Sequence, residues 1–315
     1  MLNYDKYRLT EEDIKIGIDN FFTQLLVEEK RGKQNRIKSL NELASETPTI
    51  VFVSGQPGSG KTTLSNFKED EYDAKKEAVV KVGSDKIATF HTYYDELVKL
   101  LPDECYKITR QFVRVAEPII YKSMRDSRLN IIREISLNKG ESDYAKMKEF
   151  IDSGYQVEIN VIAVDKYESF LSCIERDIKL LEVDYEPRPV ARANHDRMYE
   201  PLVQELIEIG RRGLSTRTNV YVREENKKVP FQLVWTSDGD DRYPNAYEAI
   251  ICERAKSRRK LFQKPQQYLA RIEDARNKIS LKVHDERMKK NYLRELNQLE
   301  NEFLSELALD RSVGE

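Results

Sequence analysis

The sequence of 315 residues predicts an α/β fold, with a mostly parallel sheet covered by helices and a helical extension at the C-terminal end. Three observations carry this prediction. Short apolar runs alternate with amphipathic stretches, a pattern typical of strand–helix–strand units in a parallel sheet. A glycine-rich turn directly follows the first apolar run. From residue 263 onward, apolar side chains recur at helical spacing among dense charges.

Composition and charge restrict the class of protein. Hydrophobic residues make up 39% of the chain, enough to fill a core, and 34% charged residues predict a strongly solvated surface. The formal net charge of −2 argues against nucleic-acid and membrane partners. The three cysteines are widely spaced and odd in number, and the first residues lack the apolar run of a signal peptide. We therefore expect a soluble cytoplasmic protein with no segment that crosses a bilayer.

The pattern along the chain predicts three regions. Residues 1–46 form a helical segment, in which Thr10 caps a helix and Asp13 completes a variant of the capping box. Residues 47–262 contain the alternating strands and helices and form the main domain. Residues 263–315 form a two-helix appendage or a short coiled coil.

The first strand leads into a phosphate-binding loop. Residues 49–54 are apolar and β-branched, and the GQPGSGKT that follows has the spacing of a P-loop opening a helix. Glycines let the backbone approach an anion, which backbone N–H groups and the helix N-terminus then face. We expect Lys61 to reach the outer phosphates of ATP and the Thr62 hydroxyl to bind Mg²⁺. The residues predicted to bind ATP are Gly55, Gln56, Pro57, Gly58, Ser59, Gly60, Lys61, Thr62 and Thr63.

Three later strands are predicted, and each ends on an acidic residue. They cover residues 78–85, 129–134 and 157–165. In parallel sheets, ligands bind outside the carboxyl ends of the strands. Asp85, Glu134 and Asp165 are therefore expected on the same edge of the sheet as the phosphate loop.

Amphipathic helices are predicted between and after these strands. They cover residues 61–71, 102–128, 144–153 and 167–182. Arg176 lies two residues after Ile174, about 200° around the helix axis, so it points away from the buried stripe. A proline-rich segment, 183–189, interrupts the helical pattern. Beyond it, apolar residues at helical spacing predict another amphipathic helix from Met198 to Ile209.

The remaining segments are predicted to be structural. Residues 220–222 and 231–235 are typical of two late strands, which can pair as a hairpin. The basic run 254–260 is interpreted as a solvated helix face in preference to a nucleic-acid patch, because the overall charge is balanced.

A phosphate loop alone does not separate an ATPase, a GTPase and a kinase. The Asn-Lys-x-Asp that reads guanine in GTPases is absent, and no predicted strand ends on the acidic pair usual in motor ATPases. A kinase needs an acid for the acceptor hydroxyl and cations over the transferring phosphoryl group. Asp85 supplies the acid, and Arg176, Arg188 and Arg192 supply candidate cations. These residues predict a small-molecule kinase and leave its acceptor open.

With these motifs, the chain resembles the zeta toxin family of toxin–antitoxin kinases. The glycine-rich loop is similar to the family's loop, and Asp85 with His91 six residues later resembles its acidic substrate motif. Arg176 matches the first lid arginine. Arg188, which His195 and an aspartate follow, has the spacing of the family's second lid arginine. The similar segments, in order, are residues 56–62, 85–97, 134–138, 174–176 and 188–196.

The resemblance implies phosphorylation of a sugar hydroxyl of UDP-N-acetylglucosamine, with ATP and Mg²⁺, which poisons cell-wall synthesis. It also implies a small helical antitoxin that blocks the nucleotide site. By the resemblance, Asp85 is the base, and Lys61, Arg176 and Arg188 complete the catalytic set. The substrate-binding positions that it implies are Asp85, Glu117, Glu134 and Ser136.

Two alternatives remain open. Asn138 stands where the family has an arginine, and Ile135 where it has a glycine, so the acceptor can be a nucleoside, a cofactor or a nucleic-acid end. The other alternative is a non-catalytic, ATP-gated interaction module whose C-terminal helices bind a partner.

Overall fold

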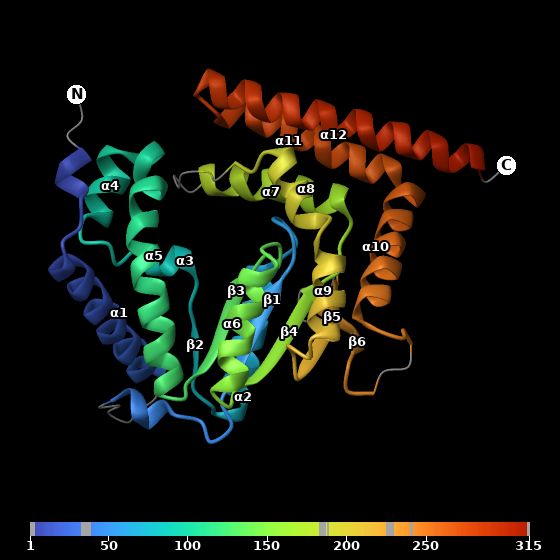
Figure 1. The fold of residues 1–315 in the computed structure, drawn as a ribbon. Helices are drawn as coiled ribbons and strands as arrows, with labels where there is room; N and C mark the ends of the chain where they lie inside the picture. Colours follow the sequence, from blue (N-terminus) through green and yellow to red (C-terminus); the bar gives the residue numbers. More distant parts are fainter. Residues whose placement is uncertain are drawn as a thin grey trace. The chain divides into compact units, whose positions relative to one another are not determined.

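The computed structural model describes residues 4–32, 39–182, 187, 189–224, 230–239 and 242–313. Its strands form a sheet in the order β2-β3-β1-β4-β5-β6, flanked by helices (Figure 1). This confirms the α/β class. The strands are β1 (Thr49–Ser54), β2 (Val79–Lys81), β3 (Asn130–Ile135), β4 (Gln156–Ile162), β5 (Arg217–Arg223) and β6 (Phe231–Thr236). The main helices are α1 (Glu11–Gly32), α2 (Lys61–Lys75), α3 (Ser84–Ala88), α4 (Tyr94–Leu100), α5 (Pro102–Asp126), α6 (Glu141–Asp152), α7 (Lys166–Leu181), α8 (Arg192–Tyr199), α9 (Leu202–Arg211), α10 (Ala246–Gln263), α11 (Pro265–Lys282) and α12 (Glu286–Val313).

The chain divides into two compact units, which we describe separately. The first unit comprises Met1–Phe52, Ser65–Glu134 and Met147–Glu158. The second unit comprises Val53–Leu64, Ile135–Lys146 and Ile159–Glu315. β2 and β3 pair in parallel in the first unit, whereas β5 and β6 form the expected antiparallel hairpin in the second. No helix among the described residues is long and apolar enough to cross a membrane.

In the first unit, α1, α4 and α5 pack together and α3 lies against α5 (Figure 1). The predicted capping box at the start of α1 is confirmed, because the Thr10 hydroxyl and amide both donate to Asp13 Oδ2 while the Asp13 amide donates to Thr10 Oγ1. Gly17 of α1 lies close to α5 and to the turn that follows α3. A Cβ there would lie 2.7 Å from the Phe112 ring and from the Phe90 carbonyl oxygen.

The second predicted strand is wrong in its length. β2 ends at Lys81, and Asp85 lies in the first turn of α3, not at the end of a strand. Val82 still donates to the Ile132 carbonyl, but the extended Gly83 then starts the helix. The alternation of apolar residues continues through Val82, so the sequence pattern did not mark where the helix begins.

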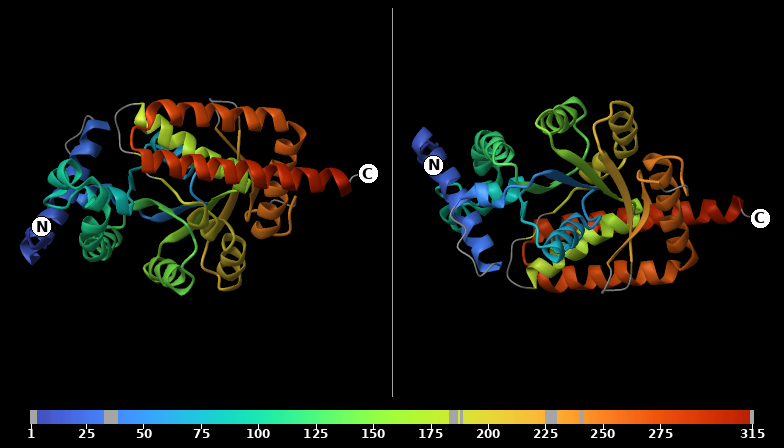
Figure 2. Two further views of the ribbon diagram at one scale, coloured as in Figure 1. Left: turned by 90° about the horizontal axis from the view of Figure 1, so that it is seen from above. Right: turned by 90° about the horizontal axis from the view of Figure 1, so that it is seen from below.

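The second unit has a large core that α7 shares with the C-terminal helices. Figure 2 shows α11 and α12 running side by side, with α7 against them. Phe170 and Ile174 of α7 are buried in one cluster with Ile272 of α11 and Phe303 of α12. These helices therefore complete the unit's core by covering the apolar stripe of α7.

Two further expectations need correction. The helix expected from Met198 to Ile209 is two helices, because the chain breaks at Glu200 and Pro201 between α8 and α9. The basic run on α10 is only partly solvated. Arg254 is buried, and Arg258 forms ion pairs within the unit.

Candidate functional site

The phosphate loop of the second unit has the backbone that its glycines predict. Gly55, Gly58 and Gly60 have φ angles of 155°, 70° and 100°, in a region that side chains disfavour. Gly58 also makes the closest approach, since a Cβ there would lie 1.9 Å from the Ser169 carbonyl oxygen and 2.8 Å from Cys173 Sγ. Burial raises the pKa of the Cys173 thiol to about 11, so this contact is with a neutral group.

Gln56 fixes the loop from inside the unit. Its side chain is fully buried, and its Nε2 donates to the Val164 carbonyl and to Ser169 Oγ, each at 3.1 Å. Its Oε1 accepts from Arg254 Nη2 at 3.3 Å. These bonds pair the buried amide of Gln56 and hold the loop on α7 and α10.

The charged and hydroxyl residues of the loop lie at the start of α2. Lys61 Nζ donates to the carbonyl oxygens of Gly55 at 2.8 Å and Gln56 at 3.1 Å, which places the ammonium group over the loop. Thr62 and Thr63 are exposed in the first turn of α2. The first turn of a helix supplies unpaired N–H groups and positive potential to an anion.

Arg223, at the end of β5, braces the other side of the loop. Its guanidinium donates to the Gly58 carbonyl, to the Ser59 carbonyl at 2.8 Å and to Ser172 Oγ at 3.1 Å. Glu168 lies 3.7 Å away as its partial counter-ion. Arg223 therefore fixes the carbonyls of the loop, which leaves the N–H groups of its backbone for a ligand.

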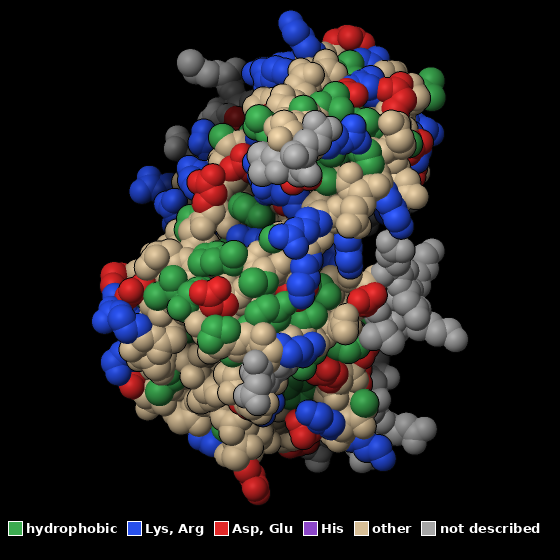
Figure 3. All heavy atoms as spheres, turned by 90° about the vertical axis from the view of Figure 1, so that its right-hand side faces the viewer, with side chains coloured by type: hydrophobic (Ala, Val, Ile, Leu, Met, Phe, Trp, Pro, Cys, Tyr) green, Lys and Arg blue, Asp and Glu red, His purple; other side chains and the backbone are tan. Residues whose placement is uncertain are grey.

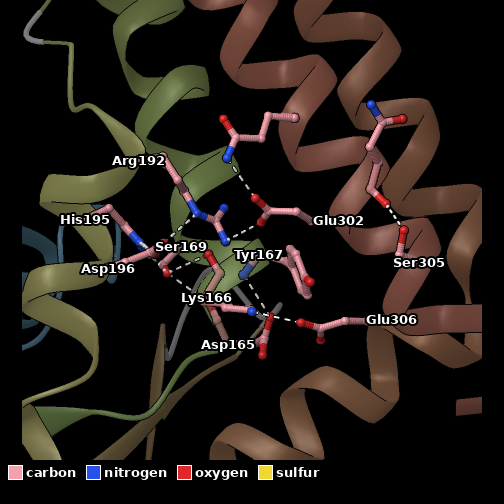
Figure 4. Close-up of polar contacts among 12 residues, drawn as sticks. Asp165, Lys166, Tyr167, Ser169, Arg192, His195, Asp196, Glu302, Ser305 and Glu306 are labelled. Atoms are coloured by element: carbon pink, nitrogen blue, oxygen red, sulfur yellow. Dashed lines mark hydrogen bonds and ion pairs between the residues drawn. The ribbon is translucent and has the colours of Figure 1, made fainter. Parts of the chain in front are cut away.

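A chain of polar side chains, buried at Ser169, His195 and Arg192, continues from the loop to the C-terminal helix (Figure 4). His195 Nε2 lies 2.9 Å from Ser169 Oγ, and its Nδ1 lies 2.8 Å from Asp196 Oδ1. Arg192 then donates to Asp196 at 3.0 Å and pairs with Glu302 of α12 at 3.2 Å. Burial lowers the pKa of His195, although Asp196 opposes the shift. A neutral histidine therefore links α7 to α8.

Ser169, His195 and Asp196 have the residue types of a hydrolase triad. Ser169 and His195 are both fully buried, however, and the Ser169 hydroxyl also accepts from Gln56. Because a substrate cannot reach a serine in this position, we assign the group to positioning the loop.

The candidate lid arginines differ in their surroundings. Arg176 is 44% exposed and points off the apolar stripe of α7, as expected, with Nε and Nη2 both donating to Asp177 Oδ1. Arg192 is only 8% exposed and forms ion pairs with Asp196 and Glu302. Arg188 lies outside the described residues.

The candidate acids of the first unit form two small groups. Asp85 is exposed in the first turn of α3, next to Ser84. The Ser84 hydroxyl donates to Glu117 Oε1 at 3.0 Å, and Arg133 Nη2 donates to the same oxygen at 3.0 Å. Arg133 also lies 4.3 Å above the Tyr121 ring. Glu117 thus has a side-chain partner on each of two elements.

Glu134 is held separately, by the Ser65 hydroxyl of α2 at 2.8 Å. Ser136 is half-buried and belongs to the second unit. Asp165 is the N-cap of α7, where its Oδ1 accepts from the Tyr167 amide at 2.8 Å and Arg258 donates to its Oδ2 at 2.8 Å. Its capping role is therefore shown. His91 is buried against the Phe112 ring, and its Nδ1 accepts from the Tyr93 amide.

The residues of the loop fit a nucleotide and its metal. Ser59 Oγ is buried without a hydrogen-bond partner, within a loop whose backbone is already shaped for an anion. No cluster of three or more His, Cys, Asp or Glu side chains among the described residues could hold a metal by itself. Mg²⁺ usually takes few protein ligands and completes its shell with phosphates and water, which suits a single hydroxyl such as that of Thr62.

Sequence reasoning missed the residues that brace the loop. Arg223 directly follows the predicted strand 220–222. Because ligands bind at the carboxyl ends of strands, the argument that selected the strand-end acids also applies to this cation. Ser169 and Arg254 gave no such signal, because each becomes relevant only through contacts with residues more than 100 positions away.

Comparison with known proteins matches the chain to a family and to several curated relatives. The family described as "Zeta toxin" matches residues 34–232. The protein "Toxin zeta" of Streptococcus agalactiae is 31% identical over 209 residues, which cover 64% of this chain and 70% of that protein. "Toxin PezT" of Streptococcus pneumoniae serotype 4 is 23% identical over 185 residues, which cover 58% of this chain and 72% of that protein.

Solved structures show the same fold. A structure reported for the PezAT chromosomal toxin–antitoxin system of Streptococcus pneumoniae superposes with a TM-score of 0.62 at 18% identity, and covers 95% of this chain and 99% of that chain. A second, the AvrRxo1-ORF1:-ORF2 complex, gives a TM-score of 0.51 at 12% identity, over 92% of this chain and 88% of that chain.

The family match covers more than half of the chain and begins before the phosphate loop. The sequence relatives agree with it, and the family's kinase-like fold implies nucleotide binding and phosphoryl transfer. An interaction module without catalysis is therefore not retained. The chain belongs to the zeta toxin family and is a phosphotransferase.

Proposed function

We propose that this protein is an ATP- and Mg²⁺-dependent kinase that phosphorylates a sugar hydroxyl of UDP-N-acetylglucosamine or a related nucleotide sugar. It would act as the toxic component of a toxin–antitoxin pair in the cytoplasm. The observation that carries the proposal is the phosphate loop of a chain of this family. Its glycines have positive φ angles and Lys61 donates to the Gly55 carbonyl, an arrangement that suits the binding of ATP as the phosphoryl donor. The proposed kinase domain spans residues 47–262, after a helical segment of residues 1–46 and before a helical extension of residues 263–315.

In this proposal, residues 55–63 bind ATP and Thr62 holds Mg²⁺. Asp85 accepts the proton of the acceptor hydroxyl, whose oxygen attacks the terminal phosphoryl group while ADP leaves. Lys61, Arg176 and Arg188 neutralise the charge on the transferring group. The proposed substrate-binding residues are Asp85, Glu117, Glu134 and Ser136. The bonds of Ser84 to Glu117 and of Ser65 to Glu134 support defined orientations for two of these acids.

The proposed protein partner is a small helical antitoxin. The support is the family itself, together with the PezAT system and the AvrRxo1-ORF1:-ORF2 complex, which are assemblies of the similar proteins. If a short helical protein is encoded beside this gene, its co-expression with this chain should relieve growth arrest. If growth stays arrested although both chains are made, that pairing is wrong.

Phosphate transfer from labelled ATP to UDP-N-acetylglucosamine tests the proposed reaction. We expect the wild-type protein to label the nucleotide sugar, and Lys61→Ala and Asp85→Asn each to reduce turnover at least about 100-fold without loss of the fold. Asp73→Asn is the matched control, because Asp73 is an exposed acid of α2 outside the proposed site. Normal turnover by Asp85→Asn would remove Asp85 as the base.

A panel of nucleosides, cofactors and nucleic-acid ends, assayed in the same way, tests the acceptor. Selective labelling of another compound, abolished by Lys61→Ala, would keep the kinase and overturn the nucleotide-sugar assignment.

A further inference from the structure

A pocket of about 350 Å³ opens in the second unit, between α8, α9, α10 and the end of α12. Figure 3 shows the face that carries α10, where Lys and Arg side chains gather next to hydrophobic ones. Arg254, Arg258 and Arg259 line the pocket from α10. Among the residues that the structure describes, none to which we assign a role in phosphoryl transfer lines it.

Arg254 is the central group. It is 7% exposed, its Nη1 donates to the Tyr199 carbonyl at 3.1 Å, and its guanidinium carbon lies 3.7 Å from the centre of the Tyr199 ring. Its Nε is buried without a hydrogen-bond partner. Arg254 forms no ion pair with a carboxylate of the described residues. Asp165, which already pairs with Arg258, offsets the charge of Arg254 without contacting it. A buried charge without a contacting counter-ion is costly, so the pocket favours an anion.

The other two arginines differ in how far their charge is matched. Arg258 pairs with Asp165 at 2.8 Å and with Glu306 at 3.1 Å, so its charge is already balanced. Arg259 is exposed at the rim and is paired with no carboxylate of the described chain. Asp310 of α12 also lines the pocket. Arg259 is therefore available to a ligand, and Arg254 adds positive charge from the wall of the pocket.

The rest of the lining is apolar. Val203, Ile251 and Phe262 form walls without charge, and Ala255 leaves space between the arginines. A volume of 350 Å³ lies at the lower end of the range for small-molecule pockets, about 300–1,000 Å³. This combination suits a small molecule with an apolar or aromatic body and one anionic group, and it is too small for a folded partner.

We propose that this pocket binds a small phosphate monoester with an aromatic or apolar body. Its phosphate would accept from the exposed Arg259, because guanidinium groups form charge-assisted bonds with phosphate, and the charge of the Arg254 guanidinium in the pocket wall would attract it. Arg254 also donates to Gln56 of the phosphate loop. The ligand would thus contact the same side chain that holds the loop, which couples the two sites.

Calorimetric titration of the full-length protein with phenyl phosphate tests the site, and phenol serves as the uncharged control. Because phosphate also suits the loop, we run the titration in Lys61→Ala as well as in the wild type. We expect saturable binding in both proteins and no binding of phenol. In the Lys61→Ala background, Arg259→Ala should weaken binding about tenfold, Ala255→Leu should abolish it by filling the space, and Lys260→Ala should leave it unchanged.

Three results would overturn the proposal. The first is the absence of saturable binding in Lys61→Ala, which would assign all binding to the loop. The second is binding that neither Arg259→Ala nor Ala255→Leu alters. The third is phenol binding as tightly as phenyl phosphate. Circular dichroism of each variant verifies the fold. The titration contains no phosphoryl transfer, so its outcome is independent of the kinase proposal.

Discussion

The phosphate loop and the acidic groups of the first unit are held in different ways. The loop is fixed through its backbone, since Arg223 binds two of its carbonyls and Gly58 leaves no room for a Cβ. The acids are fixed by side-chain bonds, from Ser84 and Arg133 to Glu117 and from Ser65 to Glu134. The bonds to the Gly58 and Ser59 carbonyls do not depend on the side chains at those two positions, whereas each bond to an acid disappears when that acid is replaced.

This difference has a consequence for function. A donor site that must hold phosphates of fixed shape tolerates little movement, because a displacement of about 1 Å can cost about 100-fold in rate. An acceptor site made of exchangeable polar side chains can change its substrate without rebuilding the backbone. We therefore expect substitutions in the loop to abolish catalysis, and substitutions of Glu117 and Glu134 to alter stability or acceptor choice.

The largest effect is expected for Gly58→Ala. The new methyl group would meet the Ser169 carbonyl oxygen at 1.9 Å, and the φ of 70° would be strained. Phosphoryl transfer should fall at least about 100-fold. The measurement is initial rate against ATP concentration. Gly210→Ala is the control, because nothing lies within 4 Å of the added methyl group. If Gly58→Ala retains normal turnover, the loop is not rigidly held.

Arg223→Ala should have the next largest effect on activity. It removes the guanidinium that holds the Gly58 and Ser59 carbonyls, so we expect the KM for ATP to rise about tenfold. Arg217→Ala is the matched control on the same strand, because its ion pair with Asp238 is half exposed. An equal KM in both variants would show that the loop keeps its shape without Arg223.

Glu117→Gln should chiefly reduce stability. Arg133 has a side chain only 9% exposed and would lose its ion-pair partner, at a cost of about 2–3 kcal/mol in the free energy of unfolding. Urea denaturation measures this change. The double variant Glu117→Gln/Arg133→Met should recover most of the stability. If that variant also recovers full turnover, Glu117 is structural and does not bind the substrate.

A smaller effect is expected from pH. Burial lowers the pKa of His195 below its usual 6.5, so the unfolded chain takes up a proton before the folded protein does. The stability that depends on the neutral histidine is complete above pH 6.5 and falls as the pH drops towards the lower, folded pKa. The free energy of unfolding should fall by at most about 1.4 kcal/mol per pH unit for this residue.

Denaturation at pH 7.5 and 5.5 measures the slope, and His195→Gln should reduce it. A residual slope is expected from His91, whose pKa burial also lowers. An unchanged slope in His195→Gln would show that His195 titrates alike in the folded and unfolded chain.

The sequence by itself determined the α/β class, the phosphate loop and the order of most elements. These follow from local signals, such as the strand before Gly55, the Gly-Lys-Thr ending and the capping box of Thr10 and Asp13. The element boundaries that were predicted wrongly also have local causes. Apolar alternation continued to Val82 although the strand had ended, and the break at Pro201 fell inside a helical period.

Only the tertiary structure decided how the loop is supported and what the C-terminal helices do. Ser169, Arg223 and Arg254 reach the loop from 113 to 198 positions away in the sequence, and no local pattern encodes such contacts. In the same way, the sequence shows that α11 and α12 are amphipathic, but only the shared core shows that they pack against α7. Periodicity shows that a face is buried, whereas packing decides what buries it.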